Sequence, residues 1–140
     1  MQKRFLLICG TLGIVIGTVV VAIFLIQSKA KPQLNLKLFI GNISKFGGNA
    51  TCANVVIPYF ANLTFNGKKI ADGEVYVRLT DNDGKDLGKV TLYYNPLDGV
   101  WSSAVMYPCL KHGNYYVFGE AIAAINGQEL HANEMREIGV

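Results

Sequence analysis

Residues 74–80 read EVYVRLT, which is the clearest strand pattern in the chain. Val75, Val77 and Leu79 recur at every second position, which is the period of a β-strand with one buried face. The turn-forming sequence DNDG follows at residues 81–84, and residues 89–94 (KVTLYY) read as the returning strand. The stretch therefore opens an antiparallel hairpin.

The same pattern extends in both directions from this hairpin. Turn sequences rich in glycine, asparagine and proline separate the segments, and no helical periodicity interrupts them. With the hairpin, this makes about seven strands, so the sequence predicts an all-β domain, an antiparallel β-sandwich over residues 34–140. Residues 41–49 are predicted to be a loop, and Pro58 indicates an edge or a bulge. The further strands are predicted at residues 34–43, 55–65, 100–106, 113–124 and 129–138.

Residues 110–115 read LKHGNY, in which Leu110, Gly113 and Tyr115 resemble the tyrosine corner of immunoglobulin-like and fibronectin-type domains. The longer run 74–124 is similar to immunoglobulin-like modules of surface and macroglobulin-like proteins. The resemblance implies an immunoglobulin-like β-sandwich, and it implies no particular activity. Cys109 precedes the corner, whereas the antibody-type cysteine would stand at Val117, so the antibody disulfide is absent.

Residues 5–26 form an apolar segment, FLLICGTLGIVIGTVVVAIFLI, without a charge or a proline. As a helix it would extend roughly 33 Å, which is enough to cross a hydrocarbon core of about 30 Å. Lys3 and Arg4 favour a cytoplasmic N-terminus. The sequence therefore predicts a cytoplasmic tail (1–4), one transmembrane helix (5–26), a linker (27–33) and an extracytoplasmic domain. A cleaved signal peptide is the alternative, although the apolar run exceeds the usual signal length.

Gly10, Gly13 and Gly17 fall on one face of this predicted helix, and the last two form a GxxxG pattern. Small residues at this spacing let two membrane helices approach closely, so these glycines are candidates for packing between copies. Glycine is also common in membrane helices without such a role. Cys9 is interpreted as an inert thiol within the same segment.

The charge of the chain is concentrated before the β-rich region. From residue 31 onward ten basic side chains balance ten acidic ones, so the net charge of +3 comes from Lys3, Arg4 and Lys29. The β-rich domain has no basic run, which excludes nucleic acid as an expected partner. The bilayer and another envelope protein are the expected partners.

Two of the three cysteines, Cys52 and Cys109, lie in the predicted extracytoplasmic domain, where disulfides persist. We expect a bond between them; two separate buried thiols are the alternative. Three N-x-S/T sequons make a glycosylated surface an expectation as well. Their asparagines are Asn42, Asn49 and Asn62.

No catalytic constellation stands out in the sequence. Asp81, Asp83 and Asp86 lack the acidic twelfth position of a calcium-binding loop and are interpreted as turn residues. Blue copper would need a histidine upstream of the cysteine, which the domain lacks. Neither Ser102 nor Ser103 sits in a nucleophile elbow. The sequence predicts no enzyme, no metal and no cofactor.

Aromatic side chains gather in the second half of the chain, where strand alternation should expose one tyrosine of each adjacent pair. These pairs are Tyr93/Tyr94 and Tyr115/Tyr116. Exposed tyrosines can mark a protein contact, and ordinary surface tyrosine is the alternative that we prefer for these pairs. From the anchor and the domain together we expect a single-pass surface protein whose domain binds or scaffolds another protein. A pilin-like filament subunit, with the apolar helix in the filament core, is the alternative. A copper electron-transfer domain is a weaker one.

Overall fold

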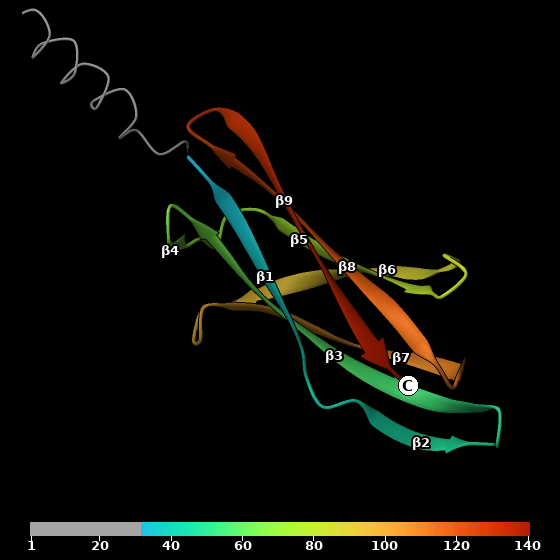
Figure 1. The fold of residues 1–140 in the computed structure, drawn as a ribbon. Helices are drawn as coiled ribbons and strands as arrows, with labels where there is room; N and C mark the ends of the chain where they lie inside the picture. Colours follow the sequence, from blue (N-terminus) through green and yellow to red (C-terminus); the bar gives the residue numbers. More distant parts are fainter. Residues whose placement is uncertain (1–31) are drawn as a thin grey trace, which may run out of the picture. The chain divides into compact units, whose positions relative to one another are not determined.

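In a computed structural model of the chain, the structure describes residues 32–140 (Figure 1). The predicted transmembrane helix at 5–26, its glycines and the tail at 1–4 lie outside the described residues, as does most of the linker. One compact unit spans Gln33–Val140. Within residues 32–140, no helix has the length and apolar character needed to span a bilayer.

The described part folds into nine antiparallel strands, which confirms the prediction of an antiparallel all-β domain. All seven predicted strands are present, most of them longer than expected, and two short strands are added. The strands are β1 (Leu34–Ile40), β2 (Ser44–Gly48), β3 (Cys52–Phe65), β4 (Lys68–Lys69), β5 (Glu74–Asp81), β6 (Asp86–Asn95), β7 (Val100–Lys111), β8 (Asn114–Ile125) and β9 (Gln128–Gly139).

The loop prediction for residues 41–49 is wrong over its second half. Ser44 and Phe46 pair with Val56 and Asn54, so β2 forms a hairpin with β3. Gly48 adopts a φ of 111° in this hairpin, and a side chain there would meet the carbonyl oxygen of Cys52 at 2.3 Å. The glycines that indicated a loop are thus what lets this strand turn tightly onto its neighbour.

Pro58 lies inside β3, neither on an outer edge nor in a bulge. Its neighbours toward the N-terminus pair with β2, and those toward the C-terminus pair with β1. The carbonyl of Pro58 accepts a hydrogen bond from Gly41 N–H, 2.9 Å away, in the connection between those two strands. Proline has no N–H group, and at this position that group would face the gap between β2 and β1. Pro58 therefore interrupts neither the β2–β3 ladder nor the β1–β3 ladder.

The strands follow the order β1-β3-β7-β6-β5-β8-β9 in one nearly closed sheet, with β2 and β4 both added to β3. The strand β6 passes from one of the two layers in Figure 1 to the other. Its first part, from Asp86 to Leu92, pairs with β5, and its last three residues pair with β7. The chain therefore changes layers within one strand.

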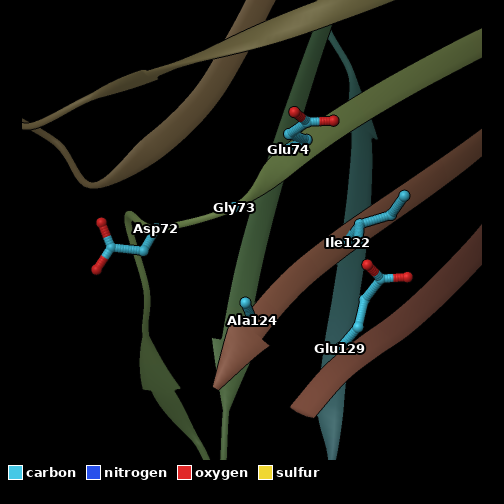
Figure 2. Close-up of a pocket in the computed structure, with 6 residues that line it drawn as sticks. All are labelled: Asp72, Gly73, Glu74, Ile122, Ala124 and Glu129. Atoms are coloured by element: carbon cyan, nitrogen blue, oxygen red, sulfur yellow. The ribbon is translucent and has the colours of Figure 1, made fainter. Parts of the chain in front are cut away.

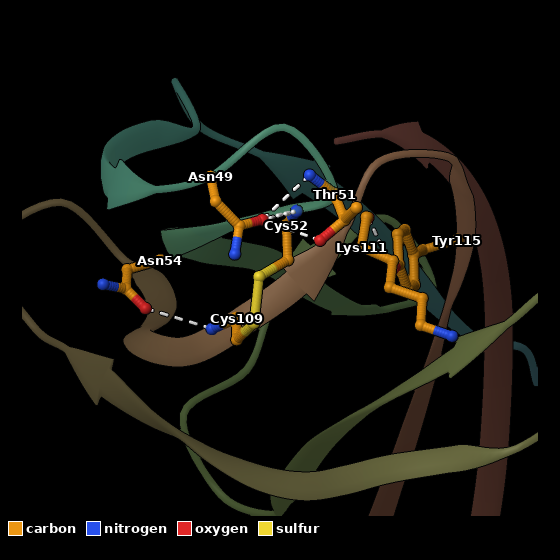
Figure 3. The surroundings of a disulfide bond; sticks show 7 residues. All are labelled: Asn49, Thr51, Cys52, Asn54, Cys109, Lys111 and Tyr115. Atoms are coloured by element: carbon orange, nitrogen blue, oxygen red, sulfur yellow. Dashed lines mark hydrogen bonds between the residues drawn. A yellow bond between two sulfur atoms is a disulfide. The ribbon is translucent and has the colours of Figure 1, made fainter.

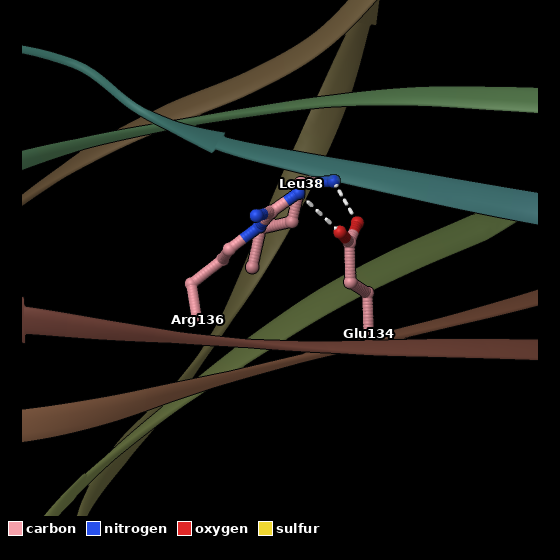
Figure 4. Close-up of polar contacts among 3 residues, drawn as sticks. All are labelled: Leu38, Glu134 and Arg136. Atoms are coloured by element: carbon pink, nitrogen blue, oxygen red, sulfur yellow. Dashed lines mark hydrogen bonds and ion pairs between the residues drawn. The ribbon is translucent and has the colours of Figure 1, made fainter.

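The two ends of this order, β1 and β9, approach one another without a regular backbone ladder. Glu134 of β9 bridges them, because its carboxylate accepts a hydrogen bond from the backbone N–H of Leu38 in β1 (Figure 4). Arg136 donates to the other carboxylate oxygen of Glu134. The Glu134 side chain is only 22% exposed. A side-chain carboxylate thus provides the acceptor that a strand partner would otherwise supply.

The core lies between the layers and follows the predicted alternation. Leu34, Leu36 and Leu38 of β1 are buried, and Val75, Val77 and Leu79 of β5 are at most 1% exposed. The central strand β3 contributes five alternate residues with 0–1% exposure: Val55, Ile57, Tyr59, Ala61 and Leu63.

Two tyrosines bring hydroxyl groups into this core. Tyr59 and Tyr107 are 0% and 7% exposed, and their hydroxyl oxygens lie 3.0 Å apart in a hydrogen bond. Burial, the main cause, raises the pKa of both above the ordinary value of 10.0. The hydrogen bond between them provides a partner for both buried hydroxyl groups. Ionising either tyrosine would place a charge in the core, so the folded state favours the protonated form of both.

This pair predicts a loss of stability in alkali. The pKa of each tyrosine is higher in the folded than in the unfolded state, so above about pH 10 the unfolded state releases protons that the folded state retains. Stability is unaffected below that pH, and above it should fall by at most about 1.4 kcal/mol per pH unit for each buried tyrosine. Urea unfolding monitored by Trp101 fluorescence at pH 8 to 11 measures this slope.

The matched variants are Y59F/Y107F, which removes both hydroxyls, and Y93F, whose tyrosine is 71% exposed. Y59F/Y107F should flatten most of the alkaline slope, and Y93F should leave it unchanged. Buried Tyr115, whose pKa burial also raises, accounts for part of the remaining slope. An equally steep slope in Y59F/Y107F would show that the pair is not the cause.

Candidate functional site

The surface most suited to a function is the solvent-facing side of the layer that contains β1, β3 and β7. One row across it joins Phe39 of β1, Phe60 of β3, Ser102 of β7 and Tyr93 of β6 by register. The aromatic residues of this row are exposed by 40%, 39% and 71% respectively. Such a row of exposed aromatic side chains is unusual on a sheet face that only meets water.

The apolar character continues toward the β2 hairpin in the next two rows. Pro58 is opposite Ala104, and Val56 is opposite Met106, whose side chain is 59% exposed. We call the outward-facing apolar and aromatic residues of this side the outer apolar face. It consists of Phe39, Phe46, Val56, Pro58, Phe60, Tyr93, Ala104 and Met106.

Lys37 marks the end of this face nearest the start of β1. Its amino group lies 5.3 Å from the centre of the Phe39 ring, where it makes a cation–π contact. The rows between Lys37 and Phe46 contain only apolar residues, serines and Asn54. A contiguous uncharged surface with a polar border is the composition of a protein contact site.

The solvent-facing side of the other layer differs in composition. Phe118 and Met135, 37% and 54% exposed, are register partners there. Phe118 is also the register partner of Arg78, which in turn pairs with Lys89. Charges therefore interrupt the apolar residues of this side, which provides matched positions for comparison.

Sequence reasoning anticipated exposed aromatics only in part. Tyr93 is exposed while Tyr94 packs against Trp101 with ring centres 5.4 Å apart, as expected for that pair. The expectation is wrong for the second pair, because Tyr115 is buried and Tyr116 is only half-buried. The sequence analysis did not predict that Phe39, Phe60 and Met106 are exposed. A signal was available for Phe60, because the run 55–61 is apolar at its outward positions as well as at its inward ones.

The predicted bond between Cys52 and Cys109 is present, with sulfur atoms 2.03 Å apart (Figure 3). It links β3 and β7, which are neighbours in one layer. Ala53 pairs with Leu110 and Val55 with Tyr107, so β7 has one residue more than β3 between these pairs. This β-bulge places Cys109 at a φ of 51°, where its N–H donates to Asn54 Oδ1 at 3.0 Å.

The residues resembling a tyrosine corner lie together where β7 turns into β8. The Tyr115 hydroxyl donates to the backbone carbonyl of Lys111, with the oxygens 2.7 Å apart. Leu110 is buried, and Gly113 has a φ of 154° in the turn. The hydrogen bond spans four residues and ties the start of β8 to the end of β7.

The three sequon asparagines occupy different environments. Asn42 is exposed between β1 and β2, and Asn49 is exposed in the turn before β3. The Oδ1 of Asn49 accepts hydrogen bonds from Thr51 N–H (2.9 Å), Thr51 Oγ1 (2.7 Å) and Cys52 N–H (3.1 Å) (Figure 3). A sugar on Nδ2 would preserve these bonds. Asn62 is half-buried, and its Oδ1 has no partner among the described residues. Glycosylation stays a prediction at all three.

The aspartates considered for calcium serve the turns. Asp81 Oδ1 accepts from the N–H groups of Asp83 (3.0 Å) and Lys85 (2.8 Å), and Asp86 Oδ1 accepts from Gly88 N–H (2.8 Å). The side chains of Asp81 and Asp86 thus accept hydrogen bonds from backbone groups of their turns, and Asp83 takes part through its backbone N–H, as expected of turn residues.

A shallow hollow with acidic borders lies between β5 and the β8–β9 hairpin. Figure 2 shows Ile122 and Ala124 in it, with Glu74 and Glu129 beside them and Asp72 turned away. Across residues 32–140, no three histidine, cysteine or acidic side chains are gathered as metal ligands. The hollow therefore has no feature that identifies a ligand.

Comparison with known proteins gives no identification. The chain matches no protein-family model, no curated protein and no solved structure.

Proposed function

We propose that this protein is a single-pass, membrane-anchored module that binds another envelope protein through the outer apolar face and performs no catalysis. The observation that carries the proposal is the exposed row of Phe39, Phe60 and Tyr93, with exposed Met106 two rows away and no charged residue in the rows between. Aromatic residues and methionine are enriched at protein interfaces, where their burial provides most of the binding energy.

The proposed domain type is an immunoglobulin-like β-sandwich. The order β1-β3-β7-β6 corresponds to strands A, B, E and D of that fold, and β5-β8-β9 corresponds to strands C, F and G. The Tyr115–Lys111 hydrogen bond supports the same assignment, because its hydroxyl reaches back to the backbone before the penultimate strand. Both features concern the scaffold, so they support a rigid platform rather than a reaction.

The proposed location is the outer side of a membrane, with the N-terminus in the cytoplasm. The apolar segment 5–26 and the flanking Lys3 and Arg4 support it. Because β1 starts at Leu34, few residues separate the segment from the domain. The disulfide and the exposed sequons Asn42 and Asn49 suit an oxidising, glycosylating compartment.

A photo-crosslinking amino acid at position 60, compared with position 118, tests the proposal in the full chain within its native membrane. Phe60 and Phe118 are equally exposed, at 39% and 37%, but lie on opposite layers. We expect one discrete adduct with a different protein from position 60 and none from position 118. No adduct at 60, or the same adducts at both positions, would refute the proposed binding face.

A further inference from the structure

One edge of β7 is left open along five residues. Its other edge pairs with β3 along nearly its whole length, but on the open side β6 pairs only with Val100, Trp101 and Ser102. From residue 103 to residue 107, no other strand of the described chain pairs with this side, and no backbone hydrogen bond from a turn reaches it. Unpaired N–H and C=O groups along a strand edge are a template for a further strand.

This open stretch has fixed limits at both ends. Ser102 is already paired with Tyr93 of β6, and Pro108, which has no N–H, begins the bulge at Cys109. Between them the sequence is Ser103-Ala104-Val105-Met106-Tyr107, without a charge or a proline. Charged residues are one of the features that protect natural sheet edges, and residues 103–107 include none. Val105 stands at its centre.

We propose that a second copy of this chain pairs with this edge, antiparallel, about a two-fold axis through Val105. In that register Ala104 faces Met106 of the other copy, and Ser103 faces its Tyr107. A small residue therefore meets a large one at every position except the axis, where Val105 meets its equivalent. Antiparallel pairing over five residues provides about four to six hydrogen bonds between copies.

The surroundings of the edge fit a second copy. The Ala104 and Met106 side chains are exposed on the outer apolar face, so pairing joins the faces of two copies into one continuous surface. None of the sequon asparagines lies on β7: Asn42 and Asn49 flank β2, and Asn62 is on β3. A sugar at the exposed sites would lie on the opposite side of β3 from the open edge. This inference goes beyond the proposed function, since it requires no other protein.

Sedimentation of the full chain in a nonionic detergent tests the pairing. Wild type should be a dimer in equilibrium with monomer. M106K should weaken the dimer about tenfold, since each copy loses an apolar cross-strand pair and gains a charge near the axis. M135K is the matched control, because Met135 is 54% exposed against 59% for Met106; it should leave the dimer unchanged.

A charge pair provides the specific test of the register. A104K/M106K places lysines opposite one another across the axis and should give monomer. A104E/M106K instead places a carboxylate at position 104 opposite an ammonium group at position 106 of the other copy. The dissociation constant of the dimer in this variant should be within about threefold of the wild-type value, because opposite charges attract across paired strands. Trp101 fluorescence checks that every variant is folded.

Three outcomes would overturn the proposal. They are a monomeric wild type, a dimer indifferent to A104K/M106K, and a failure of A104E/M106K to restore pairing in folded protein. A dimer that is lost in G13L/G17L but survives A104K/M106K would assign association to the apolar segment instead. Crosslinking from position 60 to a different protein is a separate readout, so either proposal can fail alone.

Discussion

Replacing Cys52 and Cys109 with alanine is expected to lower the free energy of unfolding by about 4 kcal/mol. The bond closes a loop of 57 residues, and removing such a cross-link restores that much conformational entropy to the unfolded chain on the chain-entropy estimate. The experiment is urea unfolding of the full chain in a nonionic detergent. Trp101 is the only tryptophan and is 5% exposed, so its fluorescence reports on this domain.

The backbone at Cys109 allows a sharper control. At a φ of 51° a residue with a side chain is disfavoured by roughly 1–2 kcal/mol relative to glycine. The variant C52A/C109G should therefore be more stable than C52A/C109A although both lack the bond. Treating wild type with reductant should give a loss similar to that of C52A/C109A. A loss below about 1 kcal/mol in both would contradict the estimate.

Leu38→Ala is expected to cost about 3 kcal/mol, within the range of roughly 2–5 kcal/mol measured for buried leucines. Leu38 is 1% exposed in β1, and a Cβ on Gly119 of β8 would lie 3.4 Å from its Cδ2. The backbone N–H of Leu38 donates to Glu134 at the junction between β1 and β9. The truncation leaves a cavity at the place where the nearly closed sheet lacks a backbone ladder. Urea unfolding followed by Trp101 fluorescence measures the loss.

Leu97 provides the matched leucine, because it is 95% exposed in the turn between β6 and β7. L97A should change the free energy of unfolding by less than about 0.5 kcal/mol. G119A should cost less in the L38A background than in wild type, since the added methyl group then meets Leu36 Cδ2, at 3.2 Å, but no longer Leu38 Cδ2. Equal losses in L38A and L97A would mean that β1 is not part of the cooperative core.

Local sequence patterns were sufficient to predict most of the strands. The alternation of Val75, Val77 and Leu79 identified a buried face, because successive side chains in a strand point to opposite sides. The two cysteines identified a disulfide for a different reason, since their predicted compartment favours oxidation. The strand β2 was missed, because it lies in the second half of the loop predicted at 41–49. The glycines and asparagines of this segment are typical of a turn, and only pairing with β3 makes part of it a strand.

The amino-acid sequence predicted an all-β antiparallel domain, a bond between Cys52 and Cys109 and a turn role for Asp81. Each of these predictions depends on the spacing of apolar residues or on the chemistry of particular residue types, and both can be read from the sequence. Which apolar residues face water and which strand edge is open depends on contacts between strands that are far apart in the sequence. Phe60 and Tyr59 read alike in the sequence, yet one is 39% exposed and the other is buried. Tyr59 is on the face of β3 that the second layer covers, and Phe60 is on the opposite face. The edge of β7 is open because β6 leaves it after three residues and joins the other layer.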